Sequence, residues 1–347
     1  MVMRYSSGMA TSRHPAGAAS PTLIFETLQA FQRTEALRAA IELDLFRFVG
    51  TGPGDVASLA KSCSASERGV RILCDYLTVI GLLNKQDGRY RHSPTSAVFL
   101  DPSSPACLAS MTRFLWSPTL QEPYAHLAEI VRRGQPPGEG TVAPDHPIWV
   151  DFALAMAPMM APMAAPLAAM ALEGRSGPMR VLDIAVGHGL FGIAVAKQEP
   201  QANIVAVDGA SVLEVAKSNA QKAGVADRYQ TLPGSAFAVE YGGPYDIALL
   251  TNFLHHFDFP TCVQLLKKVR TAMKTGGRVA ALEFVPNEDR ISPPTPAAFS
   301  LTMLASTPAG DAYTFSELEG MYHDAGFTQV LQRPVPMSPH TVVLGSA

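Results

Sequence analysis

The stretch from residue 183 to residue 192 has the residue types of a loop that binds a polar ligand. It reads DIAVGHGLFG and contains Gly187, Gly189 and Gly192. Glycine allows the backbone to turn sharply and lets a ligand approach the start of the next helix, where backbone N–H groups are free. The spacing G-x-G-x-x-G also occurs in dinucleotide-binding proteins, so it does not identify the ligand by itself.

Two acidic residues narrow the choice of ligand. Asp208 ends the next predicted strand, where a carboxylate can accept hydrogen bonds from both hydroxyls of a ribose. Asp183 lies four residues before Gly187, where a carboxylate suits a ligand with a cationic amino-acid end and would repel a pyrophosphate. Both S-adenosylmethionine and the nicotinamide cofactors contain such a ribose, so Asp208 does not distinguish them; Asp183 and the hairpin predicted at the C-terminus favour S-adenosylmethionine. The alternative for Asp183 is a hydrogen-bonded carboxylate that only orients the loop.

Two adjacent histidines follow the predicted strand YDIALL. His255 and His256 stand in LLTNFLHHFD, where the strand should deliver them to the ligand-binding edge of a sheet. Imidazole titrates near neutral pH, so it can accept a proton from a hydroxyl during a reaction. The alternative is that both are ordinary polar loop residues. A metal site with Asp258 is disfavoured because adjacent side chains point apart, so no metal is expected.

The elements that must position these residues alternate between strands and helices from Gly177 onward. Strands are predicted at MRVLDIA, NIVAVDG, YQTLPG, YDIALLTN and RVAALEFV, with helices near 189–198, 211–224 and 260–274. This alternation is typical of a parallel sheet covered on both faces. TFSELEGMYHDAGF is predicted to form a helix that Gly326 ends, and the last two segments a hairpin. The fold class is therefore α/β and Rossmann-like, with a C-terminal antiparallel hairpin.

A smaller helical domain is predicted before this sheet. Apolar residues recur at helical spacing from Pro21 to Val49, and two helices capped by Asp55 and Ser66 precede an Asp-Gly turn at Asp87. This order is typical of a winged helix. The second capped helix has too few basic residues for a reader of DNA. Apolar surface on the first two helices instead favours a dimerisation domain.

Composition and the remaining segments exclude several classes of protein. The net charge of −3 gives no reason to bind nucleic acid or an anionic membrane. Residues 152–172 are uncharged and long enough to span a bilayer, but Pro158, Pro162 and Pro166 would leave helical hydrogen bonds unmade there, so a broken, buried helical segment is expected. No secretory signal is evident, and four scattered cysteines predict free thiols and a cytoplasmic location.

From about Leu23 to its end the sequence resembles the family of plant caffeate-type and bacterial small-molecule O-methyltransferases. These are S-adenosylmethionine-dependent homodimers. The family's glycine loop, D-x-G-x-G-x-G, here has Ala185 in place of its first glycine, and Ser235 replaces the aspartate of an adenine-contacting Gly-Asp pair. The cofactor-binding residues that we predict are Asp183, Ala185, Gly187, Gly189, Asp208, Gly209, Gly234, Ser235, Ala236, Thr251 and Asn252.

The same resemblance implies how a methyl acceptor would be activated. Its catalytic histidine corresponds to His255, supported by Glu283, and the family's next residue, an aspartate, is His256 here. These three residues are the predicted catalytic group. The family's second carboxylate falls on Ala312, with Asp311 beside it. Residues predicted to wall the acceptor pocket are Phe152, Met156, Phe299 and Met303.

The sequence thus predicts a winged-helix-like dimerisation domain (residues 21–102) after a flexible tail (1–20). The next predicted part consists of pocket helices (103–175). It is followed by a class I methyltransferase domain with a mostly parallel seven-stranded sheet (176–347). The predicted reaction transfers methyl from S-adenosylmethionine, leaving S-adenosylhomocysteine, to a hydroxyl of a small aromatic or polyketide-like molecule. The alternatives are C- or N-methylation on the same fold, or a non-catalytic regulator that binds the cofactor or DNA. We expect a homodimer with no nucleic-acid or membrane partner.

Overall fold

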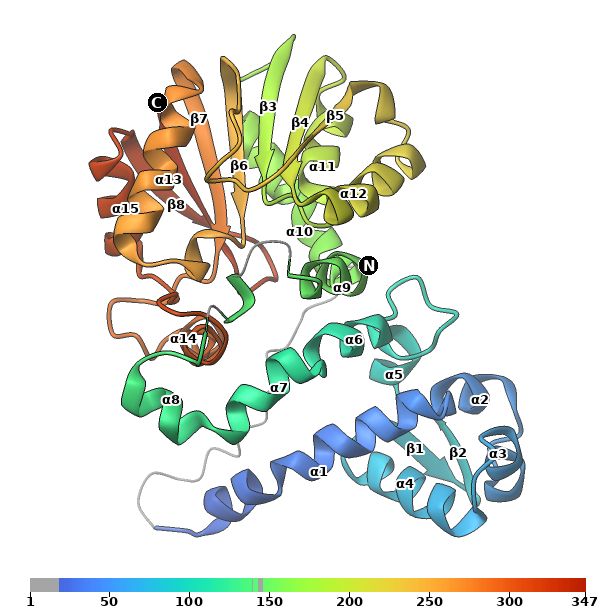
Figure 1. Ribbon diagram of the computed structural model, residues 1–347. Coiled ribbons are helices and arrows are strands. Elements are labelled where there is room, and N and C mark those ends of the chain that lie inside the picture. Colours follow the sequence, from blue (N-terminus) through green and yellow to red (C-terminus); the bar gives the residue numbers. More distant parts are fainter. Residues whose placement is uncertain (1–18, 139, 143–145) are drawn as a thin grey trace. The chain divides into compact units, whose positions relative to one another are not determined.

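The computed structural model describes residues 19–138, 140–142 and 146–347, and its contacts divide the chain into two units, Met1–Ala109 and Ser110–Ala347 (Figure 1). The flexible tail predicted for residues 1–20 lies almost wholly outside the described residues.

The N-terminal unit is helical with one small hairpin. Its elements are α1 (Thr22–Glu42), α2 (Leu45–Thr51), α3 (Val56–Ser62), α4 (Glu67–Val79), β1 (Leu83–Gln86), β2 (Arg89–His92) and α5 (Pro94–Phe99). Asp55 and Ser66 cap α3 and α4, each accepting a hydrogen bond from a backbone N–H three residues on. Asp87 and Gly88 both have positive φ angles, as a two-residue hairpin turn requires. The order of elements agrees with the expected winged helix.

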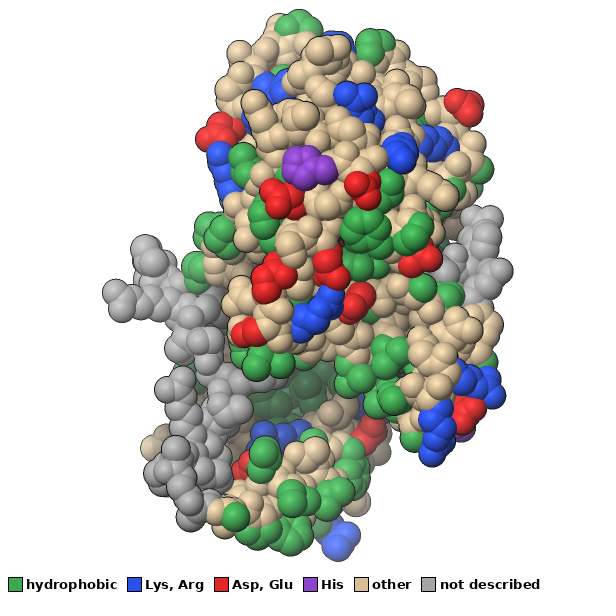
Figure 2. Space-filling view, turned by 90° about the vertical axis from the view of Figure 1, so that its left-hand side faces the viewer, with side chains coloured by type: hydrophobic (Ala, Val, Ile, Leu, Met, Phe, Trp, Pro, Cys, Tyr) green, Lys and Arg blue, Asp and Glu red, His purple; other side chains and the backbone are tan. Residues whose placement is uncertain are grey.

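Helix α1 leaves most of its apolar side chains uncovered within its own unit. Its one buried residue is Ala40, and five of its large apolar side chains are between 58% and 66% exposed. These side chains are Leu23, Ile24, Phe25, Leu28 and Phe31. Figure 2 shows hydrophobic side chains gathered on the surface of this unit. A contiguous apolar stripe of this kind is typical of an interaction surface.

The C-terminal unit contains a seven-stranded sheet with the order β5-β4-β3-β6-β7-β9-β8. Its strands are β3 (Met179–Ile184), β4 (Ala202–Asp208), β5 (Tyr229–Pro233), β6 (Tyr245–Thr251), β7 (Met273–Glu283), β8 (Thr328–Pro334) and β9 (Thr341–Ser346). The first five strands in this order pair in parallel, whereas β9 pairs antiparallel with both β7 and β8. The carboxyl ends of β3 and β6 therefore lie side by side where the strand order reverses, the usual ligand site of such sheets.

Helices cover both faces of this sheet (Figure 1). Residues of α10 (Ala157–Leu172), α11 (Leu190–Gln198) and α12 (Ala210–Lys222) pack on one face, and those of α13 (Phe259–Thr271) and α15 (Phe315–Asp324) on the other. Along β3, Val181 belongs to the first hydrophobic cluster and Leu182 and Ile184 to the second, because successive strand residues point to opposite faces. This doubly covered sheet confirms the predicted α/β class.

The remaining helices of this unit surround the ligand-binding edge of the sheet. They are α6 (Thr112–Leu115), α7 (Pro118–Ala125), α8 (Leu127–Arg133), α9 (Ile148–Ala155) and α14 (Pro294–Ser306). Short 3₁₀ turns are Ala109–Met111, Gly140–Val142, Ala226–Arg228 and Leu254–His256.

The expected break in the uncharged segment 152–172 occurs at Met156, where α9 and α10 meet at a bend of 70°. Pro158 lies in the first turn of α10, where an N–H is not needed, whereas Pro162 and Pro166 stand inside the helix. Among the described residues no single helix is long and apolar enough to cross a membrane. Only the bent pair of α9 and α10 has, when taken together, the length and apolar composition of a membrane-spanning segment.

Candidate active site

The loop after β3 has the backbone geometry that its glycines suggested. Ala185, Gly187 and Gly189 all have φ between 52° and 79°, and Ala185 adopts this left-handed conformation without being glycine. The N–H of Gly192 donates to Asp183 Oδ2 at 3.0 Å, and a Cβ on Gly192 would stand 2.6 Å from that oxygen. The carboxylate of Asp183 therefore holds the start of α11 directly.

Asp183 is buried, with 1% of its surface exposed. Its other oxygen, Oδ1, has no hydrogen-bond partner among the described residues. Burial raises the pKa of the Asp183 carboxyl to about 8, although the bond from Gly192 opposes this shift; the nearby Asp208 adds to it. A buried carboxyl group with an unpaired oxygen fits the cationic amino group of S-adenosylmethionine, which would supply the missing partner.

Asp208 ties the end of β4 to the same loop. Its Oδ2 accepts from the N–H of Gly187 at 2.9 Å, and its Oδ1 from the N–H of Gly209 at 2.7 Å. A carboxylate has further lone pairs, so Asp208 can still accept from ribose hydroxyls. The backbone N–H of Gly234 donates to the carbonyl of Asp208 at 2.9 Å, which brings the start of the next loop to this carboxylate.

The remaining predicted cofactor residues lie on neighbouring strand ends. Ser235 Oγ accepts from the N–H of Phe237 at 3.2 Å, which leaves its own hydroxyl hydrogen to donate, and Ala236 is buried. Thr251 is buried at the end of β6. Asn252 follows it with a φ of 53°, and its Oδ1 is buried without a partner among the described residues. The structure therefore brings this group together along the β5-β4-β3-β6 edge.

His255 and Glu283 form a buried pair on the ends of adjacent strands. His255 Nδ1 lies 2.5 Å from Glu283 Oε2, and the residues are 4% and 2% exposed. The other carboxylate oxygen, Oε1, accepts from the backbone N–H groups of Phe253 and Leu254 at 3.1 and 2.9 Å. This arrangement suits a carboxylate that accepts from Nδ1–H, so the lone pair of the imidazole is on Nε2.

His256 takes no part in the His255–Glu283 hydrogen bond, but its ring lies 4.4 Å from the ring of His255 and also contacts other aromatic rings. Its ring stands edge-on to Trp149 at 5.1 Å, and Trp149 stands edge-on to Phe152 at 5.7 Å. Phe152 in turn stacks on His188 of the glycine loop at 6.5 Å. Burial lowers the pKa of His188 to about 4 and that of His256 well below its usual range, so both imidazoles are neutral.

A second aromatic group lies on the other side of His255. Phe299 stands edge-on to His255 at 4.9 Å and stacks on Phe284 at 4.1 Å, and Phe284 packs on His340 at 4.1 Å. Phe152 and Phe299, both predicted from the sequence, are thus joined to the histidine pair through ring contacts. Met156 and Met303 are buried, and Met156 also packs in the core cluster beneath α10.

Sequence reasoning missed Trp149, His188, Phe284 and His340. For two of these residues the sequence contains a pattern that could have identified them. Trp149 lies three residues before Phe152 on the same helix, which places both on one face, and His188 stands inside the glycine loop itself. Phe284 and His340 meet only because β7 pairs with β9, a register that the sequence does not reveal.

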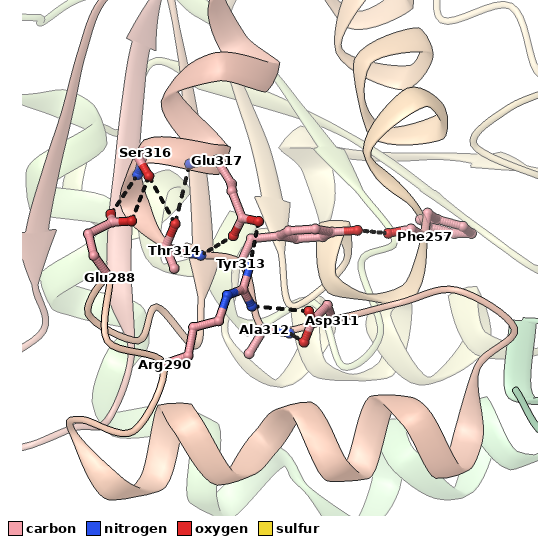
Figure 3. A network of polar contacts seen from close by, with 9 residues as sticks. All are labelled: Phe257, Glu288, Arg290, Asp311, Ala312, Tyr313, Thr314, Ser316 and Glu317. Atoms are coloured by element: carbon pink, nitrogen blue, oxygen red, sulfur yellow. Dashed lines mark hydrogen bonds and ion pairs between the residues drawn. The ribbon is translucent and has the colours of Figure 1, made fainter. Parts of the chain in front are cut away.

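Among the described residues, Glu283 is the one carboxylate that bonds to the ring of His255, and none of them replaces the family's second carboxylate there. Ala312 is buried, and Asp311 does not bond to His255. The Oδ2 atom of Asp311 pairs with Arg290 at 3.1 Å and its Oδ1 accepts from the N–H of Ala312 (Figure 3). Asp311 therefore does not stand in for the carboxylate. Among the described residues no group of three or more potential metal ligands is present.

Comparisons with known proteins agree with this geometry. Residues 163–328 match an O-methyltransferase domain, and residues 25–102 match an O-methyltransferase dimerisation domain. The structure of a candidate O-methyltransferase from Nostoc punctiforme is 48% identical, with a TM-score of 0.92, and the match covers 95% of this chain and 100% of that one. The chain belongs to the O-methyltransferase family.

Two further relatives support the enzyme class and the fold of this methyltransferase. The 3-hydroxy-5-methyl-1-naphthoate 3-O-methyltransferase of Streptomyces sahachiroi is 28% identical over 94% of both chains. Human N-acetylserotonin methyltransferase, solved in complex with SAM, shares the fold with a TM-score of 0.81 at 22% identity, covering 96% of this chain and 99% of that one. The predicted family, enzyme class and S-adenosylmethionine cofactor are thereby confirmed. The dimerisation domain spans most of the N-terminal unit and supports homodimer formation.

Proposed function

We propose that this methyltransferase transfers a methyl group to a hydroxyl of a small aromatic or polyketide-like molecule, with His255 as the general base. The observation that carries the proposal is the buried pair of His255 Nδ1 and Glu283 Oε2 at 2.5 Å. This pair fixes the imidazole and directs the lone pair of Nε2 toward a proton of the acceptor. The pair alone suffices as a base, without a metal.

S-adenosylmethionine, when bound, supplies a methyl group on a positively charged sulfur. Residues of the chain bind the cofactor and take up the proton of the acceptor. Asp183 would hold the amino group through its unpaired Oδ1, and Asp208 the ribose hydroxyls. His255 takes the proton from the acceptor hydroxyl at Nε2 as the methyl is transferred. Glu283 then stabilises the imidazolium, because its carboxylate faces Nδ1 and is already held by two backbone N–H groups.

The proposed acceptor class follows from the rings around the histidines. Trp149, Phe152 and Phe299 offer flat apolar faces, and His256 is neutral. Such surroundings favour a flat, uncharged ring system over a charged aliphatic one. The naphthoate named for the Streptomyces sahachiroi relative also has a flat aromatic ring system, although it carries a carboxylate.

A regulator that binds DNA through the winged helix is disfavoured by the pairing of its basic residues. Arg71 and Lys85 both pair with Asp75, at 3.1 and 2.6 Å. Basic side chains engaged with a carboxylate on the same face contribute less to phosphate binding. The catalytic function therefore has the better support.

His255→Ala tests the base directly. Loss of the base should lower kcat for a phenolic acceptor by about 10²- to 10⁴-fold, while the Kd for S-adenosylhomocysteine stays within about twofold, because the carboxylates proposed to hold the cofactor, Asp183 and Asp208, lie on other strands. Product mass and calorimetric titration measure the two quantities, and NMR of the product distinguishes O- from C- or N-methylation. Unchanged turnover in the variant would place the base elsewhere.

We also propose that the homodimer buries the apolar stripe of α1. Replacing Phe25 and Leu28 together by Asp should convert the dimer to a monomer, because two charges would have to enter an apolar interface. Light scattering after size-exclusion chromatography measures the mass. A control, Val79→Asp on α4, changes an apolar residue outside the stripe that is even more exposed, at 82%, and should leave the dimer intact. A dimer that survives the double change would contradict the proposal.

A further inference from the structure

We infer that the loop between α14 and α15 positions the catalytic histidine. We name this loop, residues 307–313, the seat loop, and the inference rests on the proposed role of His255 as the base. Three independent contacts carry it: backbone packing at Gly310, a hydrogen bond from Tyr313, and an ion-pair link through Arg290.

The first contact is between backbone and backbone. A Cβ on Gly310 would lie 2.9 Å from the carbonyl carbon of His256 and closer still to the carbonyl oxygen of His255. Real Cβ atoms essentially never approach so closely. The N–H of Gly310 donates to Thr307 Oγ1 at 2.9 Å, and that hydroxyl donates to the carbonyl of Met303 at 2.7 Å. The seat loop is therefore anchored on α14 and rests directly against the peptide of the base.

The second contact is a hydrogen bond to the residue two positions after His255. The Tyr313 hydroxyl donates to the carbonyl oxygen of Phe257 at 2.6 Å (Figure 3). Burial raises the pKa of Tyr313 well above its usual range, so the phenol keeps its proton and remains a donor. The backbone from His255 to Phe257 is thus held at two points by one loop.

The third contact ties this loop to the strand that carries Glu283. Arg290 follows β7 by seven residues and pairs with Asp311 at 3.1 Å and also with Glu317 (Figure 3). Glu317 completes a capping box with Thr314 at the start of α15, its Oε2 accepting from the N–H of Thr314 at 2.8 Å. Arg290 therefore joins the segment after Glu283 to the segment that supports His255.

These contacts matter because the ring of His255 has one hydrogen-bonded support among the described residues. Glu283 fixes Nδ1, but no second side chain bonds to the ring, and Ala312 offers none. The direction of Nε2 then depends on the backbone that carries the ring. A displacement of about 1 Å at a reacting group can cost about 100-fold in rate. The seat loop is thus a positioning element for the base, not a catalytic group.

Tyr313→Phe is the main test, with Tyr245→Phe as its matched control. Tyr245 is also buried and donates to a backbone carbonyl at 2.6 Å, but it begins β6, at the end of the strand away from the site. Both variants lose one buried hydrogen bond, so similar falls in Tm are expected. Only Tyr313→Phe should lower kcat, by about five- to tenfold, with the Kd for S-adenosylhomocysteine and the KM for the acceptor unchanged.

Arg290→Ala and Gly310→Ala extend the test. Arg290→Ala should lower kcat about threefold and Arg290→Lys should recover part of it. Arg333→Ala, which removes a comparably exposed ion pair with Glu173, should have no effect. Gly310→Ala should lower kcat about 100-fold with cofactor affinity retained; if it does not fold, Tyr313→Phe and Arg290→Ala decide the matter.

The outcomes separate this inference from the proposed function. The seat loop acts through His255, so Tyr313→Phe should have no further effect on the residual rate of His255→Ala. If His255→Ala is inactive but Tyr313→Phe keeps kcat within twofold of the Tyr245→Phe control, the positioning role of the seat loop is refuted. The assignment of His255 as the base is then still supported. If His255→Ala retains full turnover, the assignment of the base fails, and the inference fails with it.

Discussion

The cofactor side and the acceptor side of this active site are built in different ways. On the cofactor side, Asp183 and Asp208 bond to backbone N–H groups of one short loop, and left-handed backbone angles set its path. On the acceptor side, rings from α9, α14, the residue after β7 and the turn after β6 pack edge to face or stacked around His255 and His256. The first is fixed by hydrogen bonds close in sequence, and the second by packing between distant segments. Changes on one side should therefore leave the other side intact.

Asp183→Asn should produce the largest effect on the cofactor side. The amide cannot act as an anionic partner for an amino group, and a charge-assisted bond contributes about 1.5–3 kcal/mol, so affinity for S-adenosylhomocysteine should fall roughly 100-fold. Calorimetric titration measures the change. Met303→Leu, a volume-conserving change on the acceptor side, is the control and should keep full affinity. Unchanged cofactor binding by Asp183→Asn would show that Asp183 only orients the loop.

The pH dependence of Asp183 provides a second test. Its pKa is about 8 in the folded protein, against an ordinary value of 3.8 for an aspartate side chain. Between these values the folded chain holds a proton that the unfolded chain has lost, so this group's contribution to stability falls as the pH rises through that window. A bound amino group favours the ionised carboxylate, so cofactor affinity should instead rise toward about pH 8, by up to about tenfold per unit.

Two measurements check this pair of opposite trends. Titration of S-adenosylhomocysteine in buffers of different ionisation enthalpy should show proton release below about pH 8. Thermal unfolding should show Asp183→Asn gaining stability over the parent protein at high pH and gaining least at low pH. Affinity that does not change with pH would mean that Asp183 is already ionised before the cofactor binds.

Trp149→Ala should give a smaller effect, confined to the acceptor side. Its edge contacts with Phe152 and His256 would be lost, and aromatic pairs contribute about 0.5–1.5 kcal/mol each, so the acceptor KM should rise about tenfold. Trp149→Phe retains a ring and should recover most of the loss. Steady-state kinetics measure KM, while the Kd for S-adenosylhomocysteine should not move. A loss of cofactor affinity in Trp149→Ala would contradict the view that the cofactor side and the acceptor side are independent.

The same difference explains what the sequence could and could not predict. Asp183, Asp208 and the glycines are readable because strand, loop and helix follow one another within a few residues. His255 and Glu283 stand 28 residues apart, so their pairing came only from resemblance to a family. The contact of Trp149 with His256, and the link from Arg290 to Asp311 and Glu317, depend on how distant loops pack.

The N-terminal unit gives one further example. The helical spacing of apolar residues continues from Pro21 to Val49, so it does not indicate where the first helix ends and the second begins. The structure ends α1 at Glu42 because Asp44 takes a left-handed conformation, with a φ of 53°, before α2 begins. An aspartate tolerates this conformation better than most residues, but periodicity does not reveal where it is adopted.

The ring contacts of Trp149 have an optical consequence. The sequence contains only two tryptophans, and this one lies edge-on to both Phe152 and His256, with its indole N–H donating to the carbonyl of Thr141 at 3.0 Å. Its emission will respond to any aromatic molecule that enters beside it. Replacing Trp116 by Phe leaves a single emitter at the catalytic turn, so the enzyme itself becomes a label-free fluorescent sensor with which libraries of candidate acceptors can be screened.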